Sequence, residues 1–104
     1  MDNVAAQGAF QIGRWSIKAP AVLAPMAGVT NAPFRALCRE FGPGLVYVNE
    51  MVMATALVHG NARTQRMVTF APDESPRSLQ LYGSDPVMMG EAAARLADNE
   101  IVRR

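Results

Sequence analysis

Residues 21–41 read AVLAPMAGVTNAPFRALCREF, a short apolar run followed by a turn and an amphipathic segment. The run at 21–24 has no polar residue, which is typical of a parallel β-strand that is buried on both faces. Either Thr30 or Asn31 can cap a following helix, and Pro33 is tolerated in its first turn. An apolar stripe at helical spacing comes next, formed by Phe34, Leu37, Cys38 and Phe41. The stretch therefore predicts one βα unit.

The same order occurs twice more along the chain. A second buried-type strand is predicted at 45–48, with a helix from Met51 to Val58. Residues 61–76 then read as a connection with at most one short element, around 67–70. A third strand is predicted at 78–82, followed by a helix that Ser84 caps and in which Gly90 marks close packing. The apolar face of this last helix is predicted to contain Met89, Ala92, Ala93, Leu96 and Ala97.

The alternation of strands and helices favours a parallel sheet with right-handed crossovers. Such a sheet is either an open doubly wound sheet or a closed barrel. The first strand ends in Pro-Met-Ala-Gly at 25–28 and not in the GxGxxG motif of a dinucleotide-binding open sheet. A β-hairpin predicted around Gly13 suits a plug beneath a barrel. We therefore expect the N-terminal portion of a (β/α)8 TIM barrel, with about three βα units after the hairpin, over residues 9–104, and a loose tail over 1–8.

Composition narrows the class of protein. The chain has 104 residues, of which 50% are hydrophobic and 18% are charged, so it can form a core and is not expected to be disordered. Its net charge of +1 gives no nucleic-acid footprint by itself. No secretory signal and no membrane-length apolar run is visible in the sequence, and we expect no membrane partner. Cys38 is the only cysteine, which excludes an internal disulfide and suits a reducing, cytoplasmic location. His59 has no second ligand nearby, so no metal site is expected.

Four blocks in the chain carry a family resemblance: APMAGVTNAPFR at 24–35, GLVYVNEM at 44–51, LVHGNARTQR at 57–66 and LQLYGSDP at 79–86. In this order and spacing they resemble the tRNA-dihydrouridine synthases, which are flavoenzymes built on a (β/α)8 barrel. The resemblance covers about residues 10–98. It implies FMN-dependent reduction of uridine in tRNA to 5,6-dihydrouridine, with NAD(P)H as the reductant of the flavin.

The resemblance also implies roles for particular residues. In the family, the positions of Pro25, Met26, Ala27 and Gln80 line the FMN site. The residue types fit this role, because Met26 offers a polarizable surface and the Gln80 amide both donates and accepts hydrogen bonds. The family's acid cysteine belongs to an Asn-x-Gly-Cys-Pro block after the fourth strand, and this chain ends at Arg104 before such a block. The later phosphate-binding strands and the helical domain that holds tRNA are absent as well. The expectation is an incomplete synthase with no catalytic residue of its own, inactive alone.

Other interpretations of these residues stay open from the sequence. The Pro-Met-Ala-Gly stretch could form only a tight turn, and Gln80 could be a core amide satisfied by backbone. Glu50 could bind substrate or cap a strand end, whereas Cys38 is expected to be a core thiol. Solvated charges are expected at Arg35, Arg39, Arg63 and Arg66.

Two alternative functions stay open as well. The chain could come from another FMN-binding barrel oxidoreductase, such as a dihydroorotate dehydrogenase relative, although the block at 79–86 argues against that. It could also be a non-catalytic remnant or interaction module.

Overall fold

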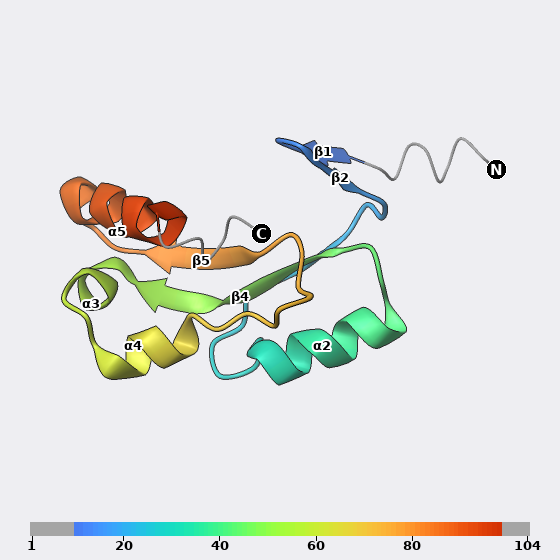
Figure 1. Cartoon of the computed structure of the whole chain (residues 1–104), viewed down its shortest axis with the longest axis horizontal. Helices are drawn as coiled ribbons and strands as arrows, with labels where there is room; N and C mark the ends of the chain where they lie inside the picture. The colour runs from blue at the N-terminus through green and yellow to red at the C-terminus, as the bar shows by residue number, and fades with distance from the viewer. Residues whose placement is uncertain (1–9, 99–104) are drawn as a thin grey trace.

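The structure, a computed structural model, describes residues 10–98 of the chain (Figure 1). The predicted tail at 1–8 lies outside these residues. A hairpin of two antiparallel strands comes first, and Gly13 adopts a φ of 57° in its turn. A three-stranded parallel sheet with its helices follows. The elements are β1 (Phe10–Ile12), β2 (Trp15–Ile17), β3 (Val22–Leu23), α2 (Ala32–Phe41), β4 (Val46–Met53), α3 (Ala54–Val58), α4 (Ala62–Met67), β5 (Ser78–Tyr82) and α5 (Pro86–Asp98).

The sheet has the strand order β3-β4-β5, so its neighbours in space are also neighbours in sequence. Both pairings are parallel: Val22 pairs with Val46, and Val48 pairs with Ser78. These pairings confirm the three adjacent parallel strands and the hairpin predicted from the pattern. The described part of the chain is thus a mixed α/β unit in which each crossover carries at least one helix.

A hydrophobic cluster joins α3 and α5 to the sheet. Val52 of β4 packs there with Ala54 and Leu57 of α3 and with Ala92 and Leu96 of α5. Leu79 and Leu81 of β5 pack against the same cluster. Because side chains alternate along a strand, Gln80 between them points to the opposite face of the sheet, where it is exposed. Helices therefore cover one face of this sheet, and Gln80 lies on the other.

The second βα unit differs from the prediction. The strand continues to Met53, beyond the predicted end at residue 48, and the helix begins only at Ala54. The prediction of a helix from Met51 was wrong because Val52 and Met53 pair with β5. One short element was expected around 67–70, but the helix of this connection, α4, lies earlier, at Ala62–Met67. Asn61 caps it by accepting a hydrogen bond from the Thr64 amide at 3.1 Å.

Two details of the third unit were also predicted wrongly. Asp85, and not Ser84, caps α5, since its carboxylate accepts a hydrogen bond from the Val87 amide at 2.9 Å. Gly90 does not mark close packing, because a Cβ there would meet no atom within 4 Å. Gly83 is the tight position, where a Cβ would lie 3.2 Å from the Met89 sulfur.

The predicted apolar stripe of helix α2 is only partly buried, since Phe34 and Cys38 are half-buried and the other two residues are exposed. Leu37 is 51% exposed and Phe41 is 81% exposed, whereas Arg35, predicted to be solvated, is fully buried. Cys38 was predicted to be a core thiol. It is half-buried, so this prediction is confirmed only in part. The Arg35 guanidinium bonds the Thr30 carbonyl and the Asn49 side chain, so Arg35 faces β4.

Candidate functional site

The loop that follows β3 is closed by its own hydrogen bonds. The carbonyl of Met26 accepts from the amides of Val29 and Thr30, both at 3.0 Å. The hydroxyl of Thr30, a fully buried residue, accepts from the Met26 amide at 3.0 Å. Gly28 has a φ of 74° with open space around its Cβ position, so the backbone conformation and not crowding requires glycine. The result is a compact turn at the carboxyl end of the first parallel strand.

Strand β4 has a bulge beside this loop. Asn49 pairs with Leu79 and Val52 pairs with Leu81, so two residues of β4, Glu50 and Met51, stand against the single residue Gln80. A bulge bends its strand and redirects side chains, and bulges are common next to active sites.

Glu50 connects the bulge to the loop. Its amide donates to the Asn49 side-chain oxygen at 2.9 Å, and its own carboxylate accepts from the Gly28 amide at 3.3 Å. The Glu50 carboxylate thus caps a backbone amide of the loop, and substrate binding by Glu50 stays a prediction.

The four residues predicted to bind a cofactor lie in the loop after β3 or on β5 opposite the bulge. Pro25 is half-buried, Met26 is 39% exposed, and Ala27 is exposed in the same loop. Gln80 is exposed on β5, opposite the bulge. The Gly28–Glu50 hydrogen bond thus connects the loop to the bulge, and the register of β4 with β5 places Gln80 opposite the bulge.

Two cavities lie near the carboxyl ends of the strands. One, of about 380 Å³, extends between α2 and α4 and is lined by Asn31, Glu50, Arg63 and Arg66, among others. The other, of about 450 Å³, is lined by residues 53–55 and 82–85 and by Met88. The four predicted cofactor-binding residues lie outside both cavities, on the loop and on the open face of the sheet.

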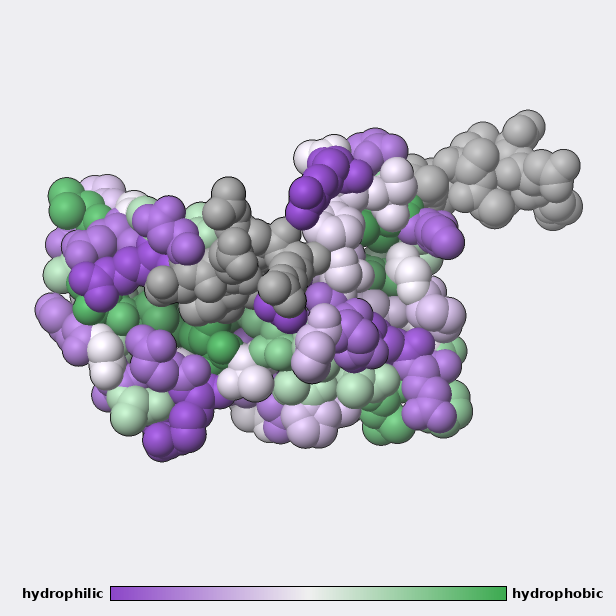
Figure 2. Space-filling view, in the orientation of Figure 1, coloured by the Kyte–Doolittle hydropathy of each residue, from purple (hydrophilic) through white to green (hydrophobic). Residues whose placement is uncertain are grey.

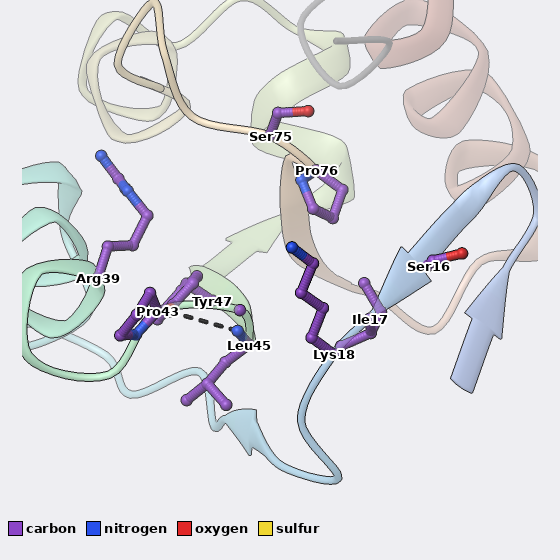
Figure 3. A pocket seen from close by; sticks show the side chains of 10 residues that line it. Ser16, Ile17, Lys18, Arg39, Pro43, Leu45, Tyr47, Ser75 and Pro76 are labelled. Atoms are coloured by element: carbon purple, nitrogen blue, oxygen red, sulfur yellow. Dashed lines mark hydrogen bonds between the residues drawn. The ribbon is translucent and has the colours of Figure 1, made fainter. Parts of the chain in front are cut away.

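A third cavity, of about 400 Å³, lies at the opposite end of the strands (Figure 3). It is lined by residues that precede the strands, among them Lys18 before β3, Leu45 before β4 and Pro76 before β5. Parallel α/β folds bind ligands at the carboxyl ends of their strands, so this cavity is not the candidate site. Its lining brings Ser16 and Ile17 of β2 near the residues that precede β4 and β5, and a plug beneath a barrel stays a prediction.

Sequence reasoning missed a buried polar cluster behind the loop. Arg35, Asn49 and Glu74 are each at most 1% exposed, and the Arg35 Nε donates to Glu74 at 2.7 Å. Arg39, also predicted to be solvated, is partly buried and lies 3.6 Å from the Glu74 carboxylate. The one signal in the sequence was the place of Arg35 at the end of the block 24–35. Arg63 and Arg66 are exposed on α4, as predicted.

Residues 10–98 form neither a metal-binding cluster nor a helix that could cross a membrane. Within that range, no group of three or more histidine, cysteine, aspartate or glutamate side chains is arranged to hold a metal ion. No helix in the same range has the length and apolarity needed to cross a membrane.

Known proteins resemble this chain over most of its length. A "Probable tRNA-dihydrouridine synthase" of Mycobacterium tuberculosis (strain H37Rv) is 50% identical over 95 residues, which cover 86% of this chain and 24% of the relative. A "tRNA-dihydrouridine synthase B" of Pseudomonas aeruginosa is 41% identical over 85 residues, covering 82% of this chain and 25% of the relative. A Vibrio cholerae protein of the same name is 38% identical over 90 residues, covering 86% and 28%.

The chain therefore spans about a quarter of the length of the curated relatives it matches. No solved structure matches it. The family model described as "Dihydrouridine synthase (Dus)" matches residues 22–102, which include the loop, the bulge and all three parallel strands. The chain belongs to the dihydrouridine synthase family.

Proposed function

We propose that this chain supplies the first three βα units of a (β/α)8 barrel that binds FMN and reduces uridine in tRNA to 5,6-dihydrouridine with NAD(P)H. The observation that carries the proposal is the hydrogen bond from the Gly28 amide to Glu50, which fixes the loop after β3 to the bulge of β4. This contact forms an ordered surface at the carboxyl ends of two parallel strands, with Gln80 across from it. Ligands of such barrels bind at this end.

The residues present fit a flavin. Among residues 10–98, the side-chain amide of Gln80 has no hydrogen-bond partner, and it points away from the helices. An amide with a free donor and a free acceptor suits the polar edge of an isoalloxazine ring. Met26 and Ala27 present a polarizable and a small side chain on an exposed loop, against which a flat ring can lie.

The chemistry divides between the cofactor and the protein. When bound, FMN supplies the hydride that the uracil ring receives. Pro25, Met26, Ala27 and Gln80 would hold and orient the ring system, and Glu50 would keep the loop in place. Cys38 does not serve as the proton donor, because it lies on α2 behind the sheet, away from the strand ends. The acid is thus supplied by a part of the enzyme other than residues 10–98. As a single free thiol, Cys38 fits the reducing cytoplasm, which we propose as the location.

A joined protein tests the cofactor part of this proposal. In it, this chain replaces the segment of the Mycobacterium tuberculosis relative that aligns with it. We expect the joined protein to purify with a flavin absorbance spectrum and to bleach on addition of NADPH or NADH. The isolated 104-residue chain, with contacts from only two strand ends, should purify colourless.

Substitution of Gln80 tests its place beside the ring. In the joined protein, Gln80→Ala should weaken FMN binding by about 1–3 kcal/mol, since it removes one side chain's hydrogen bonds from a large cofactor. Gln65→Ala is the matched control, because Gln65 is an exposed glutamine on α4. Equal FMN affinity in both variants, measured by fluorescence titration, would show that Gln80 does not touch the flavin.

A further inference from the structure

Arg35 uses its whole guanidinium group inside the protein. Its Nε and one terminal nitrogen donate to the two Glu74 carboxylate oxygens at 2.7 and 3.1 Å. The same terminal nitrogen donates to the Thr69 carbonyl, and the other donates to the Thr30 carbonyl and to the Asn49 side-chain oxygen. The guanidinium also lies 5.0 Å from the centre of the Phe70 ring. One side chain therefore joins α2 to three segments: the end of the loop at Thr30, strand β4 at Asn49, and the connection at 69–74.

Two of these segments form the candidate site. Thr30 ends the loop that begins at Pro25, and Asn49 stands directly before Glu50 in the bulge. The Asn49 oxygen that accepts from Arg35 also accepts from the Glu50 amide, and Glu50 in turn accepts from the Gly28 amide. Arg35 thus lies behind the loop and the bulge, and fixes both to the same point.

The burial of this ion pair is a poor way to gain stability. Desolvation of a guanidinium and a carboxylate offsets much of their attraction, and apolar pairs of similar volume are often as stable. An apolar side chain could not, however, bond two carbonyls and an amide oxygen in fixed directions. The rigid planar fork of arginine does this, and lysine cannot reproduce it. The fixed directions of these hydrogen bonds, which an apolar pair could not supply, make the cluster suited to fix the geometry of the loop.

We propose that Arg35, held in orientation by Glu74, is a positioning residue that sets the loop at 25–30 against Glu50 and thereby shapes the flavin-binding surface. The part that concerns flavin rests on the proposed function, whereas the positioning of the loop does not. Glu74 accepts hydrogen bonds from two guanidinium nitrogens of Arg35. It also accepts from the Ala71 amide at 3.2 Å, and this bond stabilises the connection between α4 and β5, to which Glu74 belongs.

The test uses Arg35→Lys and Glu74→Gln in the joined protein. Lysine keeps the charge but not the fork, and glutamine keeps the shape but not the charge, so the two variants disturb the cluster in different ways. Arg95→Lys is the matched control, since Arg95 makes an exposed ion pair with Glu91 on α5. Amide hydrogen exchange of Met26, Gly28, Val29 and Thr30, all bonded within the site, reports the loop, and Met89 of α5 reports the rest of the fold.

We expect loop exchange to accelerate by about tenfold or more in both variants with Met89 unchanged, and FMN affinity to fall by a similar factor, as for one or two lost charge-assisted hydrogen bonds. The control should match the parent in both measurements. Unchanged loop exchange, or equal acceleration at the loop and at Met89, would overturn the proposal and leave Arg35 with a structural role only.

Unaltered FMN affinity in a variant with a loosened loop would overturn the link to the cofactor. Failure of the unmodified joined protein to bind FMN would overturn the proposed function instead. The exchange comparison would then still decide whether Arg35 positions the loop.

Discussion

Gly28 and Gly90 have different structural roles in this chain. Gly28 has a positive φ of 74° in the loop, and its amide bonds Glu50. Gly90 lies inside α5, where a Cβ would meet nothing within 4 Å. The first glycine is required by backbone conformation, and the second only weakens a helix.

Alanine at these two positions should therefore shift stability in opposite directions. In the joined protein, Gly28→Ala should lower the free energy of unfolding by about 1–2 kcal/mol, the cost of a left-handed conformation for a residue with a Cβ. Gly90→Ala should raise it by about 1 kcal/mol, the helix-propensity difference. Urea denaturation measures both. A neutral Gly28→Ala variant would mean that the loop does not adopt the conformation described.

Single residues were predicted unevenly from the sequence. The apolar strand ends and the turn at 25–28 follow from local pattern, because burial and turn chemistry act over a few residues. Arg35 was missed because its partner Glu74 lies 39 positions away, and no local pattern reports such a pair. A charged residue beside an apolar stripe is predicted to be solvated when its distant partners are not known.

Helices and strands were predicted by type and order, but their bounds shifted where tertiary contacts compete with propensity. Residues 51–53 belong to β4 because Val52 and Met53 pair with β5, which a helix-like apolar pattern does not reveal. Helix α4 carries few apolar residues, so its sequence read as a connection, yet Asn61 caps it and Thr64 is buried. The bulge at Glu50 could not be predicted, since it depends on the register of two strands.

Helix α4 presents Arg63 and Arg66 three residues apart on the cavity beside Glu50, at the site end of the sheet. Under the proposed function, these exposed cations should contact phosphates of bound tRNA. Arg63→Gln and Arg66→Gln should each weaken tRNA binding by the joined protein and reduce the slope of log affinity against log salt by about 1. Arg95→Gln on α5 is the control. A salt slope equal to that of the parent in both α4 variants would place the RNA elsewhere.

The described chain taken as a whole leaves both edges of its sheet unpaired within residues 10–98. Strand β3 borders only β4, and β5 borders only β4. In addition, three large apolar side chains are at least half exposed, namely Val22, Leu37 and Phe41. Hydrophobic surface is visible beside α2 and between α5 and α3 in Figure 2. Open edges and apolar patches of this kind are normally covered by further structure.

We therefore expect the isolated 104-residue chain to aggregate or to behave as a molten species. Sedimentation and a thermal melt followed by near-ultraviolet circular dichroism measure this. The joined protein, in which the rest of the relative can cover the edges, should sediment as a defined species and unfold cooperatively. A cooperative transition of a monodisperse 104-residue chain would show that these surfaces need no cover.

Formation of dihydrouridine is the most direct test that this chain is the opening part of a uridine-reducing flavoenzyme. Unmodified tRNA is incubated with NADPH and either the joined protein, the isolated chain or the unaltered Mycobacterium tuberculosis relative, and the digested nucleosides are measured by mass spectrometry. We expect dihydrouridine with the joined protein and with the relative, and none with the isolated chain. Dihydrouridine from the relative but none from a flavin-loaded joined protein would contradict the proposed function, as would turnover by the isolated chain.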